Sequence, residues 1–97
     1  MRITWDPAKA RANRAKHGVA FETAKALLEG KADYLVIYDE DHSEDEDRFF
    51  AIGPTVDGLI TVVYAEQIDD RIRIISARPA TRREQTLFRR HAQGHKR

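Results

Sequence analysis

The stretch Asp70–Glu84, DRIRIISARPATRRE, constrains the fold of this chain more than any other segment. Ile72 and Ile74 alternate with arginines, which is the period of a strand with one buried face. The stretch ends in a capping box, in which the Thr81 hydroxyl accepts from the backbone N–H of Glu84 and the Glu84 side chain reaches back. The segment therefore predicts a strand that passes directly into a helix.

Three arginines lie where the predicted strand meets the predicted helix: Arg78, Arg82 and Arg83. Guanidinium groups and helix N-termini both bind phosphate, because both present N–H donors and positive charge. The alternative is that Arg82 and Arg83 are merely solvated residues of the first turn. Against it, a cation at a helix N-terminus is disfavoured by roughly 0.3–1 kcal/mol. We therefore expect a binding site for a polyanion at this corner.

The net charge of +1 is distributed unevenly along the sequence. Residues 1–31 carry seven basic and three acidic side chains, residues 32–70 carry one and twelve, and residues 71–97 carry nine and one. This segregation predicts that the two ends attract a polyanion, while the middle repels one or holds a basic partner.

The length and composition favour a single domain over residues 1–97, with residues 94–97 as a frayed tail. The absence of cysteine removes disulfides, thiolate chemistry and Cys-ligated zinc, and it suits a reducing cytoplasm. No apolar run approaches the roughly 18–20 residues of a membrane helix, and the N-terminus lacks the apolar region of a signal peptide. We expect a cytoplasmic protein without a membrane partner.

The predicted elements follow the order β-α-α-β-β-β-β-α. Asp6 and Pro7 mark a helix start, and Gly18 is a good residue to end that helix. The thin apolar side of this helix is Ala8, Ala12 and Ala15, and Asn13 is expected on another face with the basic residues. The expected strands are 2–5, 34–38, 48–56, 59–66 and the strand that opens at 70, and the expected helices are 7–17, 22–29 and 82–93. An acidic loop separates the second strand from the third, at residues 39–47. The fold class is α+β, with an antiparallel sheet, an N-terminal helical hairpin and a C-terminal helix.

Two turns predict a strand register. If Asp57-Gly58 is a two-residue hairpin loop, Phe50 faces Ala65, and if Asp69-Asp70 is another, Ala65 faces Ile74. One face of the sheet is then apolar and forms the core: Phe50, Ile52, Val63, Ala65, Ile72 and Ile74. The other face is half polar and open to a ligand or partner: Phe49, Tyr64, Glu66, Arg71 and Arg73.

The sequence resembles the BrnT family of toxins in three long motifs. The first is Trp5-Asp6-Pro7-x-Lys9-x-x-x-Asn13-x-x-Lys16-His17-Gly18-Val19-x-Phe21-Glu22-x-Ala24. The second is Arg48-Phe49-x-x-Ile52-Gly53, and the third is Ile72-Arg73-Ile74-Ile75-Ser76-Ala77-Arg78, followed by the Arg83-Glu84 helix start. The similarity extends over nearly the whole chain.

This resemblance implies a RelE-like ribonuclease toxin fold and a toxin of a type II toxin–antitoxin pair. The implied activity is endoribonuclease cleavage of RNA, independent of metal and without a cofactor, which arrests translation. The implied partner is a BrnA-type antitoxin in a hetero-oligomer, and operator DNA is bound only through that antitoxin. A non-catalytic module that binds RNA or protein through the same basic surface is the alternative.

RNA cleavage by attack of the 2′-hydroxyl needs a base, an acid and cations that stabilise the charged phosphorane. We expect Arg78 and Arg82 to supply the charge and His17 to act as acid or base, because histidine is the side-chain type best suited to proton transfer near neutral pH. A histidine that is stabilised by the C-terminus of its own helix is an equally good interpretation of His17.

Further basic residues are predicted to bind RNA: Arg83, Lys16, Arg48 and Arg73. Lys16 is equally compatible with simple solvation, and Arg48 with an ion pair to the acidic loop. Glu66 is a conceivable base, although a cross-strand pair with Arg73 explains it as well.

The antitoxin is predicted to contact the half-polar face of the sheet: Tyr64, Arg71, Arg73 and Ile75. The acidic loop with His42 contains plausible metal ligands but lacks the spacing and the turn glycine of a calcium loop. We therefore interpret it as a solvated loop or a contact for a basic antitoxin segment, and we predict no metal site.

Overall fold

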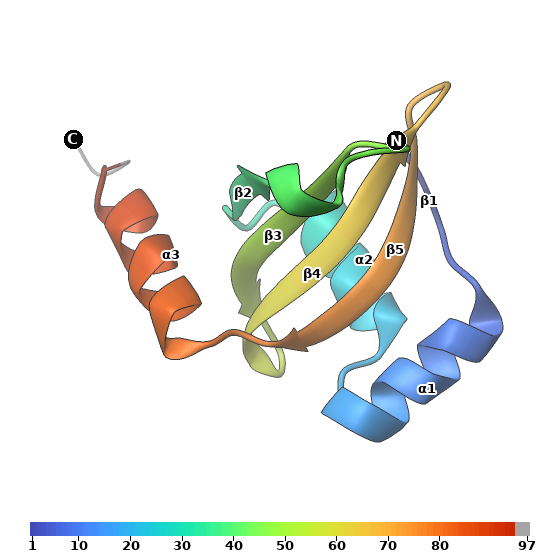
Figure 1. Ribbon diagram of the computed structural model, residues 1–97. Helices are drawn as coiled ribbons and strands as arrows, with labels where there is room; N and C mark the ends of the chain where they lie inside the picture. The colour runs from blue at the N-terminus through green and yellow to red at the C-terminus, as the bar shows by residue number, and fades with distance from the viewer. Residues whose placement is uncertain (95–97) are drawn as a thin grey trace.

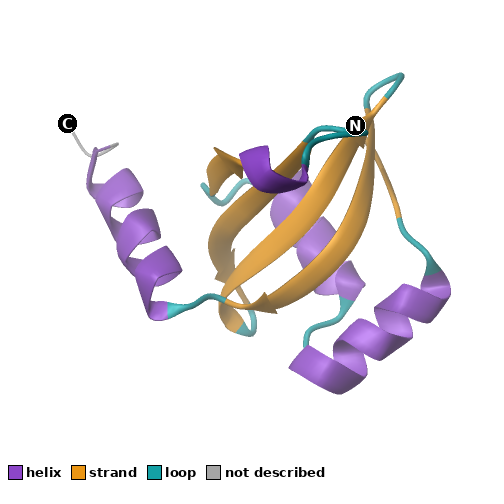
Figure 2. Cartoon of the chain, in the orientation of Figure 1, coloured by secondary structure: helices purple, strands orange, loops and turns teal. Residues whose placement is uncertain are grey.

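The computed structural model describes residues 1–94 and contains a five-stranded sheet with helices (Figures 1 and 2). Its elements in order are β1 Arg2–Thr4, α1 Pro7–His17, α2 Phe21–Glu29, β2 Leu35–Tyr38, the 3-10 helix η1 Glu40–His42, β3 Arg48–Thr55, β4 Gly58–Gln67, β5 Arg71–Pro79 and α3 Arg82–Gly94. Of the tail predicted to fray, Gly94 is the last residue of α3, and residues 95–97 lie outside the described part of the chain.

The α+β class and the predicted element order are confirmed, with one correction to the sheet. The strand order is β1-β5-β4-β3-β2, and the last four strands are antiparallel to their neighbours as expected. β1 instead pairs in parallel with β5, with Ile3 opposite Ile72, so the sheet is mixed. The chain leaves β1 through α1 and α2 and enters the sheet again at the far edge with β2. The antiparallel meander from β2 to β5 then brings β5 alongside β1 in the same direction.

The predicted capping residues of α1 are confirmed. Asp6 accepts a hydrogen bond of 2.9 Å from the backbone N–H of Ala8, and Pro7 is the first helical residue. Gly18 has φ +72°, the left-handed conformation that glycine adopts without a steric penalty, and its N–H bonds to the Arg14 carbonyl. The helix therefore begins and ends where local sequence chemistry requires.

The β3–β4 hairpin differs from the predicted register by two residues. The loop residues are Val56 and Asp57, and Gly58 pairs with Thr55 in a left-handed conformation of φ +88°. Phe50 consequently faces Val63 rather than Ala65. A shift of two residues leaves every side chain on its original face, because the pleat has a period of two.

The register between β4 and β5 differs from the prediction by one residue near the turn. A shift of one residue changes which side chains of β5 share a face with those of β4. Asp69 and Asp70 are both left-handed, with φ +63° and +57°, but Gln67 pairs with Arg71, so three residues form the turn. A bulge at Val63/Tyr64 then restores the predicted pairing farther along β5, where Val62 faces Ala77. The predicted pairs of Ala65 with Ile74 and of Glu66 with Arg73 are therefore wrong.

The predicted division of the two sheet faces is corrected accordingly. The face that packs on α1 and α2 contains Phe49, Ala51, Ile60, Val62, Tyr64, Ile72, Ile74 and Ala77. Phe50, Ile52, Val63 and Ala65 lie on the opposite face, called the open face below, with the side chains of Arg48 and Arg73. Ile52 and Ala65 are nevertheless fully buried, as expected of core residues, whereas Phe50 and Val63 are half-buried. In Figure 1, α2 lies behind the sheet and η1 in front of it, while α3 stands beside β3.

Gly53 shows how closely α2 packs on this sheet. A Cβ atom at this position would lie 2.8 Å from the side chains of Leu27 and Tyr34, so only glycine fits beneath the helix. Among the described helices, none is long and apolar enough to cross a membrane.

Candidate active site

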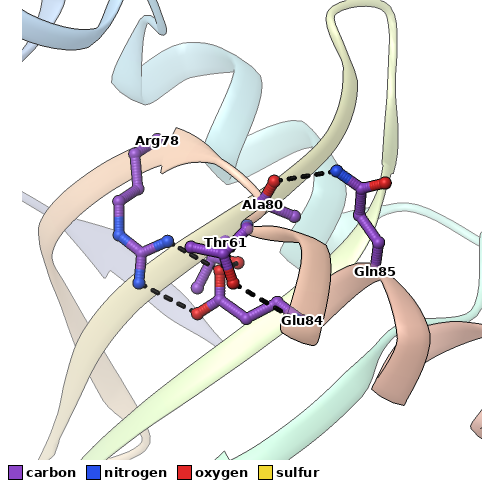
Figure 3. Close-up of polar contacts among 6 residues, drawn as sticks. Thr61, Arg78, Ala80, Glu84 and Gln85 are labelled. Carbon is purple, nitrogen blue, oxygen red and sulfur yellow. Dashed lines mark hydrogen bonds and ion pairs between the residues drawn. The ribbon is translucent and has the colours of Figure 1, made fainter.

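The corner between β5 and α3 is built around an ion pair between Arg78 and Glu84. Two guanidinium nitrogens of Arg78 donate to the two carboxylate oxygens of Glu84 at 2.7 and 2.9 Å, and Figure 3 shows the two groups facing each other. The Thr61 hydroxyl donates to the same carboxylate at 2.9 Å. Strands β4 and β5 and helix α3 thus meet at one carboxylate.

The predicted capping box is confirmed and supplies the fourth contact of this carboxylate. The backbone N–H of Thr81 donates to Glu84 Oε1 at 2.9 Å, and the Glu84 N–H donates to the Thr81 hydroxyl at 3.2 Å. Glu84 therefore caps α3 and holds Arg78 at the same time. Sequence reasoning assigned only the first of these roles, because the ion pair depends on how β5 bends into α3.

The pKa values of the pair follow from these contacts. Burial raises the pKa of Glu84, but the hydrogen bonds from Arg78, Thr81 and Thr61 and the charge of Arg78 outweigh it and lower the pKa to about 2. The hydrogen bond to Glu84 raises the pKa of Arg78 above its usual value. Both groups remain charged at neutral pH, so Glu84 is a very weak base.

Arg78 keeps donors for a further ligand. A guanidinium has five N–H groups, and Glu84 occupies two of them. The other three remain, and the Arg78 side chain is 27% exposed. Arg82 and Arg83 lie in the first turn of α3, and both are exposed. The structure therefore brings the three predicted arginines to one helix N-terminus.

Asn13 is a polar residue of this region that sequence reasoning misplaced. It was expected on the solvated side of α1, but it is only 8% exposed and bonds to the edge of β5. Its amide donates to the Ala77 carbonyl at 2.8 Å and accepts from the Ala77 N–H at 3.1 Å, and it also donates to Val19 O at 3.0 Å. Its place in the first of the three family motifs was the available signal.

Asn13 also determines where Lys16 and His17 lie. Both are in the last turn of α1, about one turn beyond Asn13, and Lys16 is exposed while His17 is half-buried. Because Asn13 bonds to the residue that precedes Arg78, this end of α1 is attached to the same end of β5. The end of α1 and the end of β5 also lie close together in Figure 1.

Arg48 and Arg73 belong to a different part of the open face. They flank Ala65 at the other end of the sheet, and Arg73 is five positions from Arg78 along β5, roughly 16 Å at strand spacing. Arg73 pairs with Glu46 of the acidic loop rather than with Glu66. The backbone N–H of Arg48 donates to Ser43 Oγ at 3.0 Å, so Arg48 also lies next to that loop.

The acidic loop has internal contacts at its start, although most of its side chains are exposed, as predicted. Asp39 is buried, its carboxylate lies 2.9 Å from His42 Nδ1, and its carbonyl accepts from the Ser43 hydroxyl. Within residues 1–94 no three His, Asp or Glu side chains converge on a possible metal position.

The residues predicted to meet an antitoxin do not all lie on the open face. Tyr64 is 5% exposed and stacks on Phe49 with ring centroids 5.5 Å apart, so its side chain belongs to the core. Burial, with smaller contributions from Tyr34 and Glu66, raises the pKa of Tyr64 to about 12. Arg71 is exposed, Arg73 is half-buried, and Ile75 is half-buried at the bulge.

Comparisons with known proteins identify the family of this chain. Residues 5–84 match the family described as the ribonuclease toxin BrnT of type II toxin–antitoxin systems. A search of curated proteins gave no match. The crystal structure of the Brucella abortus ribonuclease toxin BrnT is similar, with a TM-score of 0.60 and 28% sequence identity over 84% of this chain and 99% of that one. Because the family match covers most of the sequence, including the α1 motif and the Arg78–Glu84 corner, this chain belongs to the BrnT family of ribonuclease toxins.

Proposed function

We propose that this ribonuclease toxin cleaves RNA internally at the corner formed by Arg78 and the first turn of α3. The observation that carries the proposal is the Arg78 guanidinium, which Glu84 holds beside a helix N-terminus that also carries exposed Arg82 and Arg83. A phosphodiester at this corner would meet three guanidinium groups and the positive end of a helix dipole.

The proposed reaction is the attack of a 2′-hydroxyl on the adjacent phosphorus. A base removes the 2′-proton, the new O–P bond forms as the bond to the 5′-oxygen breaks, and an acid protonates the leaving oxygen. The products are a 2′,3′-cyclic phosphate and a 5′-hydroxyl. Arg78 and Arg82 stabilise the charged phosphorane, and Arg83 and Lys16 bind the flanking phosphates. These fixed cations supply the stabilisation without a bound metal.

His17 is the proposed acid or base. It lies in the last turn of α1, and imidazole is the side-chain group that most often transfers protons in catalysis. Glu84, with a pKa of about 2, and Tyr64, with a pKa of about 12 and a buried side chain, are poorly suited to that task.

Replacement of Arg78 tests the proposal. We expect Arg78→Ala to lower the single-turnover cleavage rate of a labelled RNA by about 10²–10³, the usual effect of removing one donor to a developing oxyanion. RNA affinity should fall much less, because the other cations remain. Arg90→Ala, which removes an exposed charge from α3, is the matched control and should cleave normally.

Two results of this experiment would contradict the proposal. Undiminished cleavage by Arg78→Ala would place the chemistry elsewhere. Wild-type protein that binds RNA but leaves it intact, with and without added metal, would favour the alternative of a non-catalytic binding module.

We further propose that a BrnA-type antitoxin neutralises the toxin in the cytoplasm, where RNA cleavage would arrest translation. Arg71, Arg73 and Arg78 share the open face of β5, with Ile75 between them. An antitoxin segment with acidic and apolar side chains would match this face and cover the RNA-cleaving corner. Operator DNA would then be bound through the antitoxin alone.

A further inference from the structure

We propose that Glu84 is a positioning residue for catalysis, which acts through Arg78 and is itself fixed by Thr61. The inference rests on the proposed role of Arg78 in RNA cleavage and goes beyond it, because it assigns a catalytic contribution to side chains that do not touch the RNA. Glu84 would determine which N–H groups of Arg78 face the phosphate.

The contacts of the Glu84 carboxylate make it a rigid platform. Oε1 accepts from Arg78 Nη1, the Thr61 hydroxyl and the Thr81 N–H, and Oε2 accepts from Arg78 Nη2. These donors come from β4, β5 and the start of α3. Thr61 is completely buried, so solvent water does not compete for its hydroxyl. A carboxylate held from three elements cannot rotate without breaking several of these bonds.

The fork between Arg78 and Glu84 fixes the plane of the guanidinium. Two parallel N–H···O bonds keep both planar groups nearly coplanar. Because both terminal nitrogens face Glu84, the Nε–H and one N–H on each terminal nitrogen remain for the substrate. The side of the guanidinium that contains Nε can still bind a phosphate through two N–H groups.

Such fixation matters because transition-state stabilisation requires donors that are oriented before the reaction. An arginine side chain on its own samples many rotamers. The negative charge of Glu84 weakens the attraction of Arg78 for phosphate, but Arg82 and Arg83 keep the corner positive. Glu84 therefore weakens the binding of phosphate by Arg78 but fixes the orientation of the guanidinium. The orientation is what affects the rate of the chemical step.

A double-mutant cycle tests this role. Glu84→Gln keeps the size of the side chain but weakens the charged fork, and we expect kcat to fall about tenfold to a hundredfold while KM changes less than threefold. In an Arg78→Ala background the same substitution should change kcat less than twofold, because there is no longer a guanidinium to orient.

Two further variants separate positioning from folding. Thr61→Val removes the buried hydroxyl but leaves both charged partners in place, and it should lower kcat in the same direction by a smaller factor. Gln85→Ala is the control, because Gln85 donates to the Ala80 carbonyl at 3.0 Å on the same turn of α3 but does not contact the fork (Figure 3). Gln85→Ala should retain wild-type kcat.

The outcomes distinguish this inference from the proposed function on which it rests. Full cleavage by Arg78→Ala would remove the proposed function itself. Loss of cleavage in Arg78→Ala, with normal kcat in both Glu84→Gln and Thr61→Val, would overturn the positioning role alone. A further loss of kcat on adding Glu84→Gln to Arg78→Ala would also overturn it, because Glu84 would then act independently of Arg78. If Glu84→Gln does not fold, Thr61→Val in both backgrounds provides the same comparison.

Discussion

Glu84 shows how one side chain can serve local structure and a tertiary site together. The Thr81-to-Glu84 spacing predicts a capping box, and both bonds of that box form. The same carboxylate then accepts two bonds from Arg78. The cap holds the Glu84 carboxylate next to the Arg78 guanidinium at the end of β5. A local helix-capping motif therefore also places the acidic partner of Arg78.

The lowered pKa of Glu84 predicts how acid affects the stability of the fold. The pKa is about 2 in the folded protein and about 4.5 in the unfolded chain, so the carboxylate stabilises the fold fully above pH 4.5 and loses this effect as the pH falls toward 2. The shift corresponds to about 3 kcal/mol at most. We expect Glu84→Gln to be less stable than wild type at pH 7 in urea unfolding.

The difference between the two proteins should shrink steadily between about pH 4.5 and pH 2. Taking the difference cancels the titration of the other carboxylates, which both proteins share. A difference in unfolding free energy that stayed constant from pH 7 to pH 2 would contradict the ion pair as its cause.

At the scale of elements, Asn13 joins α1 to the sheet. β1 covers the edge of β5 only as far as Arg73, so the backbone of Ala77 lacks a neighbouring strand on that side. The Asn13 side-chain amide accepts from the backbone N–H of Ala77 and donates to its carbonyl oxygen, as a neighbouring strand would. One side chain thereby completes the sheet edge and attaches the helix that carries Lys16 and His17.

Replacement of Asn13 should therefore destabilise the protein. Asn13→Ala removes three hydrogen bonds and leaves buried backbone groups of Ala77 and Val19 without these partners. We expect a loss of about 2–4 kcal/mol in the free energy of unfolding, measured in urea, and faster hydrogen exchange at the Ala77 amide. Arg11→Ala changes an exposed residue of the same helix and should alter stability by less than about 0.5 kcal/mol. Equal stability of the two variants would contradict this role for Asn13.

At the scale of the whole molecule, charge is divided between two regions of the open face. Arg73 is paired with Glu46 of the acidic loop, whereas the corner of Arg78 is paired with a single carboxylate and flanked by exposed arginines. The acidic loop thus occupies part of the basic surface, and the region around α3 remains positive. An acidic partner would be attracted to the α3 end of this face.

This distribution predicts a shared surface for the antitoxin and the RNA. Arg73→Ala and Arg78→Ala together should weaken antitoxin binding at least about tenfold, because both charges lie on the face that the antitoxin is proposed to cover. Calorimetry with purified antitoxin measures the affinity. The double variant Arg11→Ala and Arg14→Ala has the same net charge, changes exposed residues of α1, and should bind normally. Unchanged affinity of the first variant would mean that neutralisation acts at another surface.

The sequence by itself determined the features that depend on neighbouring residues. Helix α1 begins at Asp6 and Pro7 and ends at Gly18, and α3 begins at its capping box. The three motifs identify the family. Each of these signals acts over a few residues or is shared with relatives. Hydrophobic alternation and turn residues predicted the strands between them, whereas η1 was not predicted.

Only the tertiary structure decided which side chains share a face of the sheet. A three-residue β4–β5 turn moves Tyr64 into the core, and the bulge at Val63/Tyr64 then changes the alternation along β5. Because of that bulge, Arg73 and Arg78 lie on the same face although their numbers differ by five. Alternation of side chains is a property of one strand, whereas a bulge is defined by its partner strand, so the position of Arg78 beside Glu84 emerges only when the strands pair.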